Sequence, residues 1–159
     1  MKKQIWICDT CGQEIKEAEH GWVEWLTARG DGQGRSSGLR LVHHNKYSPK
    51  QPPSCCSYYA IKESNNANSN VCDQHLTGFL GSDGLMQLLT FLHTKEFADV
   101  EEVLQMIKRL HVPGYEQAFR HINEAIADRV FEPNGPDFYV SQNQIDAVIE
   151  WTEQKQQEA

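Results

Sequence analysis

The chain has no long run of apolar residues, and this absence excludes a membrane-spanning helix. Its 159 residues are 39% hydrophobic and 23% charged, and the mean hydropathy is -0.61, whereas a spanning helix needs about 20 consecutive apolar residues. The first residues are basic, but the apolar segment of a signal peptide does not follow them. We therefore expect a globular, cytoplasmic protein with one ordinary hydrophobic core.

The common catalytic motifs are also missing from the sequence. There is no nucleophile elbow, and no helix carries paired carboxylates beside an apolar cleft. Gly30, Gly32 and Gly34 alternate as in some phosphate loops, but a predicted strand follows them where a phosphate loop needs a helix. These glycines favour a flexible hairpin tip. Because the sequence shows none of these catalytic motifs, we expect the protein not to be an enzyme.

Positive charge is scarce in the carboxy-terminal part. Residues 1–62 carry nine Lys and Arg against six Asp and Glu, while residues 63–159 carry six against sixteen. Such an acidic segment repels the phosphate backbone of nucleic acids at long range. The charge pattern therefore disfavours a nucleic-acid partner and favours another protein.

Five cysteines are present, all between positions 8 and 72, and an odd number does not close into a disulfide framework. Cys8 and Cys11 form a C-x-x-C knuckle, which lets two thiolates of one turn reach a zinc ion. Cys72 and His75 have the same spacing and precede an apolar run, so we predict that they open a helix and complete the site. Four protein ligands would make this zinc ion structural.

The order of a knuckle, a β-hairpin and a second ligand pair resembles the treble-clef and zinc-ribbon modules over residues 8–80. The resemblance rests on Cys8, Cys11, Cys72 and His75, and residues 48–70 form an insertion that the compact modules lack. An alternative second pair remains open at the end of the hairpin and in that insertion. Its candidates are His43, His44, Cys55 and Cys56.

Two other functions remain as alternatives. His43 or His44, Asn70 and His75 resemble the base, the orienting amide and the metal ligand of HNH-type endonucleases. The order of the predicted helices, followed by a turn between short extended segments, resembles a winged-helix DNA-binding regulator. The candidate reading helix between residues 115 and 130 is balanced in charge rather than basic, which favours a helical core.

Hydrophobic periodicity predicts an α+β fold. Two strands over residues 21–26 and 38–43 should pair as a hairpin, and residues 55–61 could add a short strand. Four helices are expected: at 84–93, 99–110 and 115–130, and a last one capped by Ser141 and Gln144. We predict a zinc-stapled β-rich module over residues 1–80, packed on a helical region over 81–159 in one compact body. The function we expect is that of a cytoplasmic, metal-stabilised scaffold that binds a protein partner.

Overall fold

The structure is a computed structural model that describes residues 4–28, 35–50, 55–58 and 69–159. The chain forms two compact units, one of residues 5–111 and one of residues 112–159 with the amino-terminal Gln4. The division follows His111 and not Leu80, because the first two long helices pack with the sheet in the first unit. The hairpin tip predicted around the alternate glycines lies outside the described residues.

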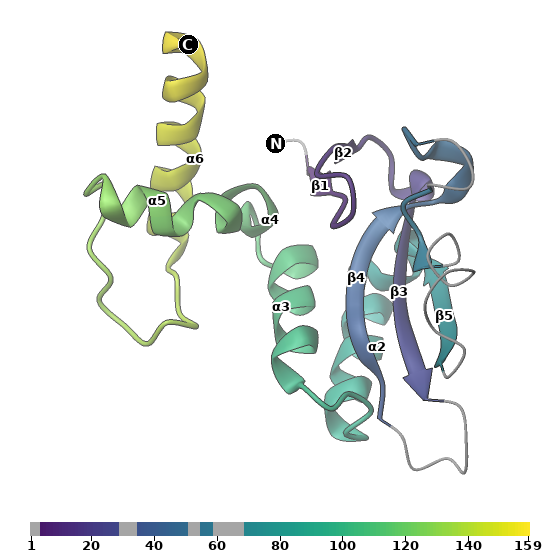
Figure 1. The fold of residues 1–159 in the computed structure, drawn as a ribbon. Coiled ribbons are helices and arrows are strands. Elements are labelled where there is room, and N and C mark those ends of the chain that lie inside the picture. The colour runs from purple at the N-terminus through teal and green to yellow at the C-terminus, as the bar shows by residue number, and fades with distance from the viewer. Residues whose placement is uncertain (1–3, 29–34, 51–54, 59–68) are drawn as a thin grey trace. The chain divides into compact units, whose positions relative to one another are not determined.

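The first unit contains two antiparallel sheets. In the larger sheet the central strand β3 lies between β4 and β5 (Figure 1). The small sheet carries the cysteine knuckle between its two strands. The strands are β1 (Trp6–Ile7), β2 (Glu14–Ile15), β3 (Gly21–Ala28), β4 (Ser37–His43) and β5 (Ser69–His75).

The predicted hairpin is confirmed as β3 and β4, with Val23 opposite Leu41 and Glu24 opposite Arg40. The third strand is not the predicted one. Residues 55–58 are not a strand, and residues 59–61 lie outside the described part. β5 takes this place instead, and it pairs with the other edge of β3.

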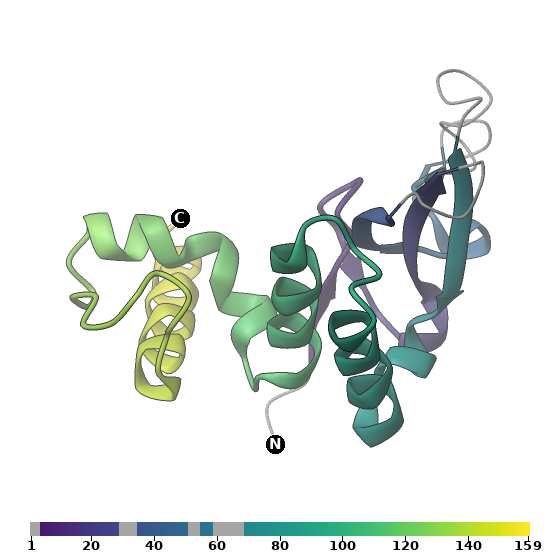
Figure 2. The same cartoon turned by 90° about the horizontal axis from the view of Figure 1, so that it is seen from below.

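Two amphipathic helices cover one face of the larger sheet (Figure 2): α2 (Gly81–His93) and α3 (Val100–His111). Leu88 of α2 and Val103 and Met106 of α3 are buried in one core with Val23 and Leu41 of the sheet. A capping box at the start of α3 is only half formed. Asp99 caps the helix by accepting from the amide of Glu101, but the Glu102 carboxylate binds the amides of Gly38 and Leu39 at the start of β4.

The second unit is helical and has its own core. The predicted helix over 115–130 is interrupted by a 3-10 turn at Phe119–His121, which separates α4 (Tyr115–Ala118) from α5 (Ile122–Ala127). The last helix, α6 (Gln142–Glu158), begins with the predicted Ser141–Gln144 capping box. It continues through the polar tail to Glu158.

The observed elements confirm the α+β class, with strands in the amino-terminal part and helices towards the carboxy terminus. Residues 112–159 are all described and contain no strand, so the extended segment expected at residues 137–140 is wrong. Tyr139 instead closes a turn by donating its amide to the Pro136 carbonyl. Among the described residues, no helix is both long and apolar enough to cross a membrane.

Candidate metal centre

Four side chains of the first unit form a cluster that can hold a metal ion: Cys8, Cys11, His43 and Cys56. Their ligand atoms, one from each residue, all lie within 4.8 Å of one another. The His43 Nδ1 atom lies 3.4 Å from Cys11 Sγ and 3.9 Å from Cys56 Sγ. Cys8, His43 and Cys56 are buried. Three sulfur atoms and one imidazole nitrogen therefore face one small volume.

The knuckle that carries Cys8 and Cys11 is a tight turn between β1 and β2. The Cys8 amide donates to the Gln13 carbonyl at 3.0 Å, and the Gly12 amide donates to the Cys8 carbonyl at 2.9 Å. Gly12 has a φ of 72°, a left-handed conformation that glycine adopts without a Cβ clash. These bonds direct both sulfur atoms to the same side of the turn.

Asp9, which lies inside the knuckle, attaches it to the free edge of β4. The Asp9 amide donates to the Leu41 carbonyl at 2.7 Å, and Asp9 Oδ2 accepts from the Leu41 amide at 2.8 Å. Arg109 of α3 donates from Nη1 to Asp9 Oδ2 at 2.7 Å and from Nη2 to the Ile7 carbonyl at 3.1 Å. Docking on this edge brings the knuckle close to the end of β4, where His43 lies.

His43 is held in the orientation that a metal ligand needs. Its Nε2 atom lies 3.2 Å from the Glu14 carbonyl oxygen, which can only accept, so Nε2 carries the proton and Nδ1 keeps a free lone pair. Burial lowers the pKa of His43, despite the opposing effect of the Glu14 hydrogen bond. The ring is therefore neutral at physiological pH, with Nδ1 directed towards the sulfur atoms.

Cys56 comes from a segment that is fixed on the other face of β3 and β4. The Cys56 carbonyl accepts from Thr10 Oγ1 at 2.6 Å and from Arg40 Nη2 at 3.2 Å. The Arg40 guanidinium also pairs with Glu24 at 2.8 Å and stacks 3.5 Å from the centre of the Tyr58 ring. These contacts hold residues 56–58 against the sheet.

Glu24 completes this arrangement as a fully buried carboxylate. It accepts from the Tyr58 amide through both oxygens, at 2.9 and 3.1 Å, in addition to the Arg40 ion pair. Burial raises the pKa of Glu24, although the Arg40 charge and the hydrogen bonds act in the opposite direction. The Arg40 ion pair and the Tyr58 hydrogen bonds offset part of the cost of burying this carboxylate. The same contacts hold Cys56 beside the knuckle.

Two thiols of the cluster, those of Cys11 and Cys56, favour the protonated form in the absence of a metal ion. Burial raises the pKa of Cys11 and raises that of Cys56 to about 12, and Cys8 adds to both effects. A hydrogen bond from Ser48 opposes the shift at Cys56. A bound cation would replace these protons, so metal binding must release protons and become tighter as pH rises.

The structure does not bring the favoured second pair, Cys72 and His75, to the knuckle. They lie on strand β5, where Cys72 faces Trp25 and His75 faces Trp22 in the β3 ladder. His75 ends the strand directly before a short 3-10 helix, Leu76–Phe79, as the sequence predicted, but Cys72 lies within the strand. The knuckle binds the β4 edge, whereas β5 lies on the opposite side of β3, about 10 Å from β4 at ordinary strand spacing. The Cys72 sulfur instead lies 3.8 Å from Thr27 Oγ1.

Two of the four residues proposed as an alternative second pair contribute to the cluster. His43 and Cys56 join the cluster, and His44 and Cys55 do not. The His44 ring stacks on that of His75, with centroids 5.6 Å apart, while Cys55 is buried outside the cluster. The residues that support the site, such as Asp9, Glu24 and Arg109, gave no signal in the sequence because their partners lie far away along the chain.

Comparison with models of protein families, with curated proteins and with solved structures gave no match to this chain. The cluster must therefore be interpreted from its own geometry and chemistry.

Proposed function

We propose that this chain is a small zinc-binding protein in which the ion is structural. The observation that carries the proposal is the cluster of Cys8, Cys11, His43 and Cys56, a Cys₃His donor set. Zn–S and Zn–N bonds of about 2.3 and 2.0 Å place tetrahedral ligands about 3.4–3.8 Å apart. The separations of 3.4 and 3.9 Å between His43 Nδ1 and two sulfur atoms match such a tetrahedron, and soft thiolates favour zinc over magnesium or calcium.

Four protein ligands leave no open position on a tetrahedral zinc ion, which supports a non-catalytic role. The nuclease alternative gains no support from the geometry, because His43 belongs to the metal cluster. Asn70 and His75 lie opposite Thr27 and Trp22, at the two ends of the β5 ladder and about 17 Å apart at strand spacing. The winged-helix alternative lacks its wing, since residues 112–159 contain no strand.

Elemental mass spectrometry of the purified protein tests the metal proposal, because adjacent cysteines supply a matched control. We expect one zinc ion per chain in the parent, retention of zinc in Cys55→Ser, and loss of zinc in Cys56→Ser. Cys72→Ser should also retain zinc. Zinc lost from Cys72→Ser and kept in Cys56→Ser would overturn the ligand set, and a parent protein purified without bound transition metal would overturn the site.

The biological role that we propose for this metal-stabilised unit is to bind a protein partner in the cytoplasm. Support comes from α2, which leaves Met86 63% and Leu89 43% exposed one turn apart on the same face. Methionine packs adaptably against varied partners, and apolar side chains that gather on one helix face are typical of protein interfaces. The acidic carboxy-terminal part favours a protein over a nucleic acid as this partner.

A photo-crosslinking amino acid at position 86, introduced in the cells that produce the protein, tests this role. We expect one defined protein adduct, which should disappear when Leu89→Glu is added, because a charge would be buried at the contact. The same crosslinker at Glu153, an exposed position on α6, is the control. Identical adducts from both positions, or none from position 86, would contradict the proposed interface.

A further inference from the structure

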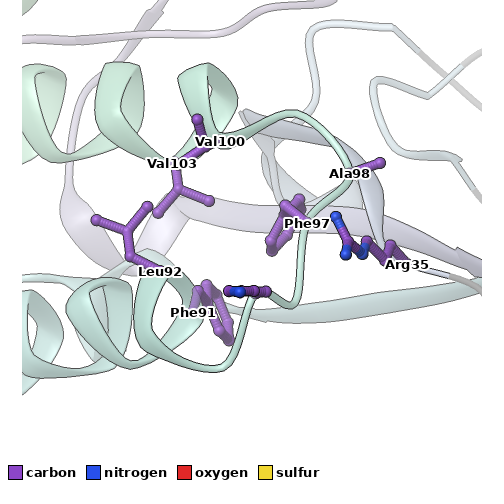
Figure 3. Close-up of a pocket in the computed structure, with 8 residues that line it drawn as sticks. Arg35, Phe91, Leu92, Phe97, Ala98, Val100 and Val103 are labelled. Carbon is purple, nitrogen blue, oxygen red and sulfur yellow. The ribbon is translucent and has the colours of Figure 1, made fainter.

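A second site of the first unit lies between α2 and α3, where a pocket of about 380 Å³ opens at the surface (Figure 3). Its walls are formed by six apolar side chains: Phe91, Leu92, Phe97, Ala98, Val100 and Val103. This volume is at the lower end of the range of small-molecule sites, which are concave, largely apolar and carry a few polar groups. The pocket lies beyond the start of β4, whereas the metal cluster lies at its other end, about 20 Å away along the strand.

The pocket is supported by a rigid aromatic cluster. Phe91 and Phe97 have ring centroids 5.4 Å apart, and Trp25 of β3 packs 5.4 Å from Phe91 and 6.3 Å from Phe97. Phe97 and Val103 are buried in the main core of the unit. These walls are held by the core itself, so the pocket does not depend on a ligand to form.

The polar groups that line the pocket carry one sign of charge. Arg35 and Lys95 are both exposed, and no carboxylate is found among the described lining residues. Glu96 and Glu102 lie nearby in the sequence, but they accept hydrogen bonds from Ser36 Oγ and from the β4 amides. In Figure 3 Leu92, Val100 and Val103 gather at one end, while Ala98 and the Arg35 guanidinium lie at the other end, beyond Phe97.

Lys95 stands at a backbone position that ordinarily takes glycine. Its φ is 53°, directly after the end of α2. The Lys95 amide donates to the Leu92 carbonyl and the Glu96 amide to the Phe91 carbonyl, which is the pattern of a helix end closed by a left-handed residue. A non-glycine residue is strained in this conformation. The Lys95 ammonium is favourably placed near the negative end of the α2 dipole, and its side chain also lines the pocket.

We propose that this pocket binds a small molecule with an apolar body and a carboxylate head, such as a medium-chain fatty acid. The apolar chain would lie between Leu92, Val100 and Val103, and the carboxylate would pair with Arg35 and Lys95. Two cationic side chains at one pocket favour an anionic head group, although the net charge of the chain is -7. The proposal is independent of the protein-binding role.

Calorimetric titration of the zinc-loaded protein with octanoate, 1-octanol and octylamine tests the proposal. We expect octanoate to bind saturably with a Kd of the order of 0.1–1 mM, octanol more weakly and octylamine not at all. The methyl NMR signals of Leu92, Val100 and Val103 should shift on addition of octanoate. Octanol that binds as tightly as octanoate, or octanoate that shows no saturable binding, would overturn the proposed recognition.

Lys95→Gly tests whether the Lys95 ammonium binds the carboxylate of the ligand, independently of any effect on the stability of the fold. It removes the ammonium and relieves the strained backbone, so the protein should keep or raise its melting temperature while octanoate binding weakens about threefold to tenfold. Arg35→Gln should weaken binding by a similar factor. Arg129 is the matched control: it is also left-handed, with a φ of 58°, but lies in the second unit. Arg129→Gly should leave octanoate binding unchanged, and equal losses in both glycine variants would overturn the role of Lys95.

Val100→Trp tests whether octanoate binds between the apolar walls of the pocket and not elsewhere on the surface. Val100 is 49% exposed, so a larger side chain can be accommodated without unfolding the protein while it fills the pocket. We expect octanoate binding to be lost in this variant. Phe138→Trp, at a residue of the second unit that is 49% exposed and does not line the pocket, should retain it. Undiminished binding in Val100→Trp would place the ligand elsewhere and overturn the proposal.

Discussion

Arg109 of α3 and Asp9 of the cysteine knuckle form an ion pair of 2.7 Å, although one hundred residues separate them in the sequence. The Arg109 side chain is only 6% exposed and that of Asp9 is 24% exposed. The guanidinium also reaches the Ile7 carbonyl, so a single side chain of the helix layer holds the residues on both sides of Cys8. The helices therefore position the metal ligands as well as covering the sheet.

Arg109→Met should destabilise the protein strongly, because it leaves the Asp9 carboxylate without its buried partner. We expect the free energy of unfolding, measured by denaturant titration of the zinc-loaded protein, to fall by roughly 3 kcal/mol. Lys155→Met is the control, since Lys155 is 47% exposed and pairs with Glu124 and Asp128 at the surface. That change should leave the free energy of unfolding almost unaltered, because solvent screens an exposed pair, and equal losses would contradict the structural role of Arg109.

Thr10→Val should weaken zinc binding without removing a ligand. The Thr10 hydroxyl donates to the Cys56 carbonyl at 2.6 Å, and valine keeps the shape of the side chain but loses this bond. Loss of such a supporting contact lowers metal affinity by about 10-fold to 100-fold. Competition with a chromophoric chelator measures the change. Thr27→Val, beside the non-ligand Cys72, should leave the affinity unaltered, and a similar loss in both variants would argue against the assigned ligand set.

The buried carboxyl of Glu24 should titrate above its ordinary value of 4.5, because burial raises its pKa. The folded protein then holds this proton more tightly than the unfolded chain. The contribution of Glu24 to stability is full below pH 4.5 and is lost as pH rises through the pKa of the folded state.

Carbon-13 NMR of the labelled carboxyl tests the shift directly, with Glu24→Gln to assign the signal. Relative to Glu24→Gln, the parent should lose stability as pH rises. A midpoint below 4.5, or a stability difference that grows with pH, would contradict the assignment.

Gly114→Ala should destabilise the second unit more than Gly81→Ala destabilises the first. Both glycines are left-handed, with φ values of 75° and 65°, so either alanine is strained by about 1–2 kcal/mol. At Gly114 a Cβ would also lie 2.9 Å from Ile149 Cδ1, whereas at Gly81 nothing lies within 4 Å. Thermal unfolding should therefore show a larger loss for Gly114→Ala by about 1–3 kcal/mol. Equal losses would mean that α6 does not pack as described.

The features that could be predicted from the sequence are those with a local pattern. Regular apolar spacing identified α2, α3 and the β3–β4 hairpin, and Ser141 with Gln144 marked the start of α6. The strand β5 was missed because Asn70, Asp73 and Gln74 give it no apolar alternation. It is a strand because its backbone completes the ladder of β3.

The metal site, too, could be predicted only where its residues form a local pattern. The spacing of Cys8 and Cys11 is local and indicated a ligand pair. The choice between Cys56 and Cys72 depends on where each segment docks: Cys72 lies in the edge strand β5, whereas Cys56 packs over Glu24 and Arg40. That choice is made by long-range contacts, above all the burial of Glu24 under Arg40 and the Tyr58 amide. A single sequence does not reveal which of its charged residues will be buried together.

The hydrogen bonds between Asp9 and Leu41 have a consequence for the solubility of the protein. Edge strands present unpaired backbone groups that can recruit strands from other molecules, and proteins usually block them. At β4 the block consists of the metal knuckle around Leu41 and the Glu102 carboxylate at Gly38 and Leu39. Chelation of the metal should free the Leu41 end of this edge. We expect the stripped protein to self-associate through β4 into β-rich aggregates, so that metal supply would control its colloidal state.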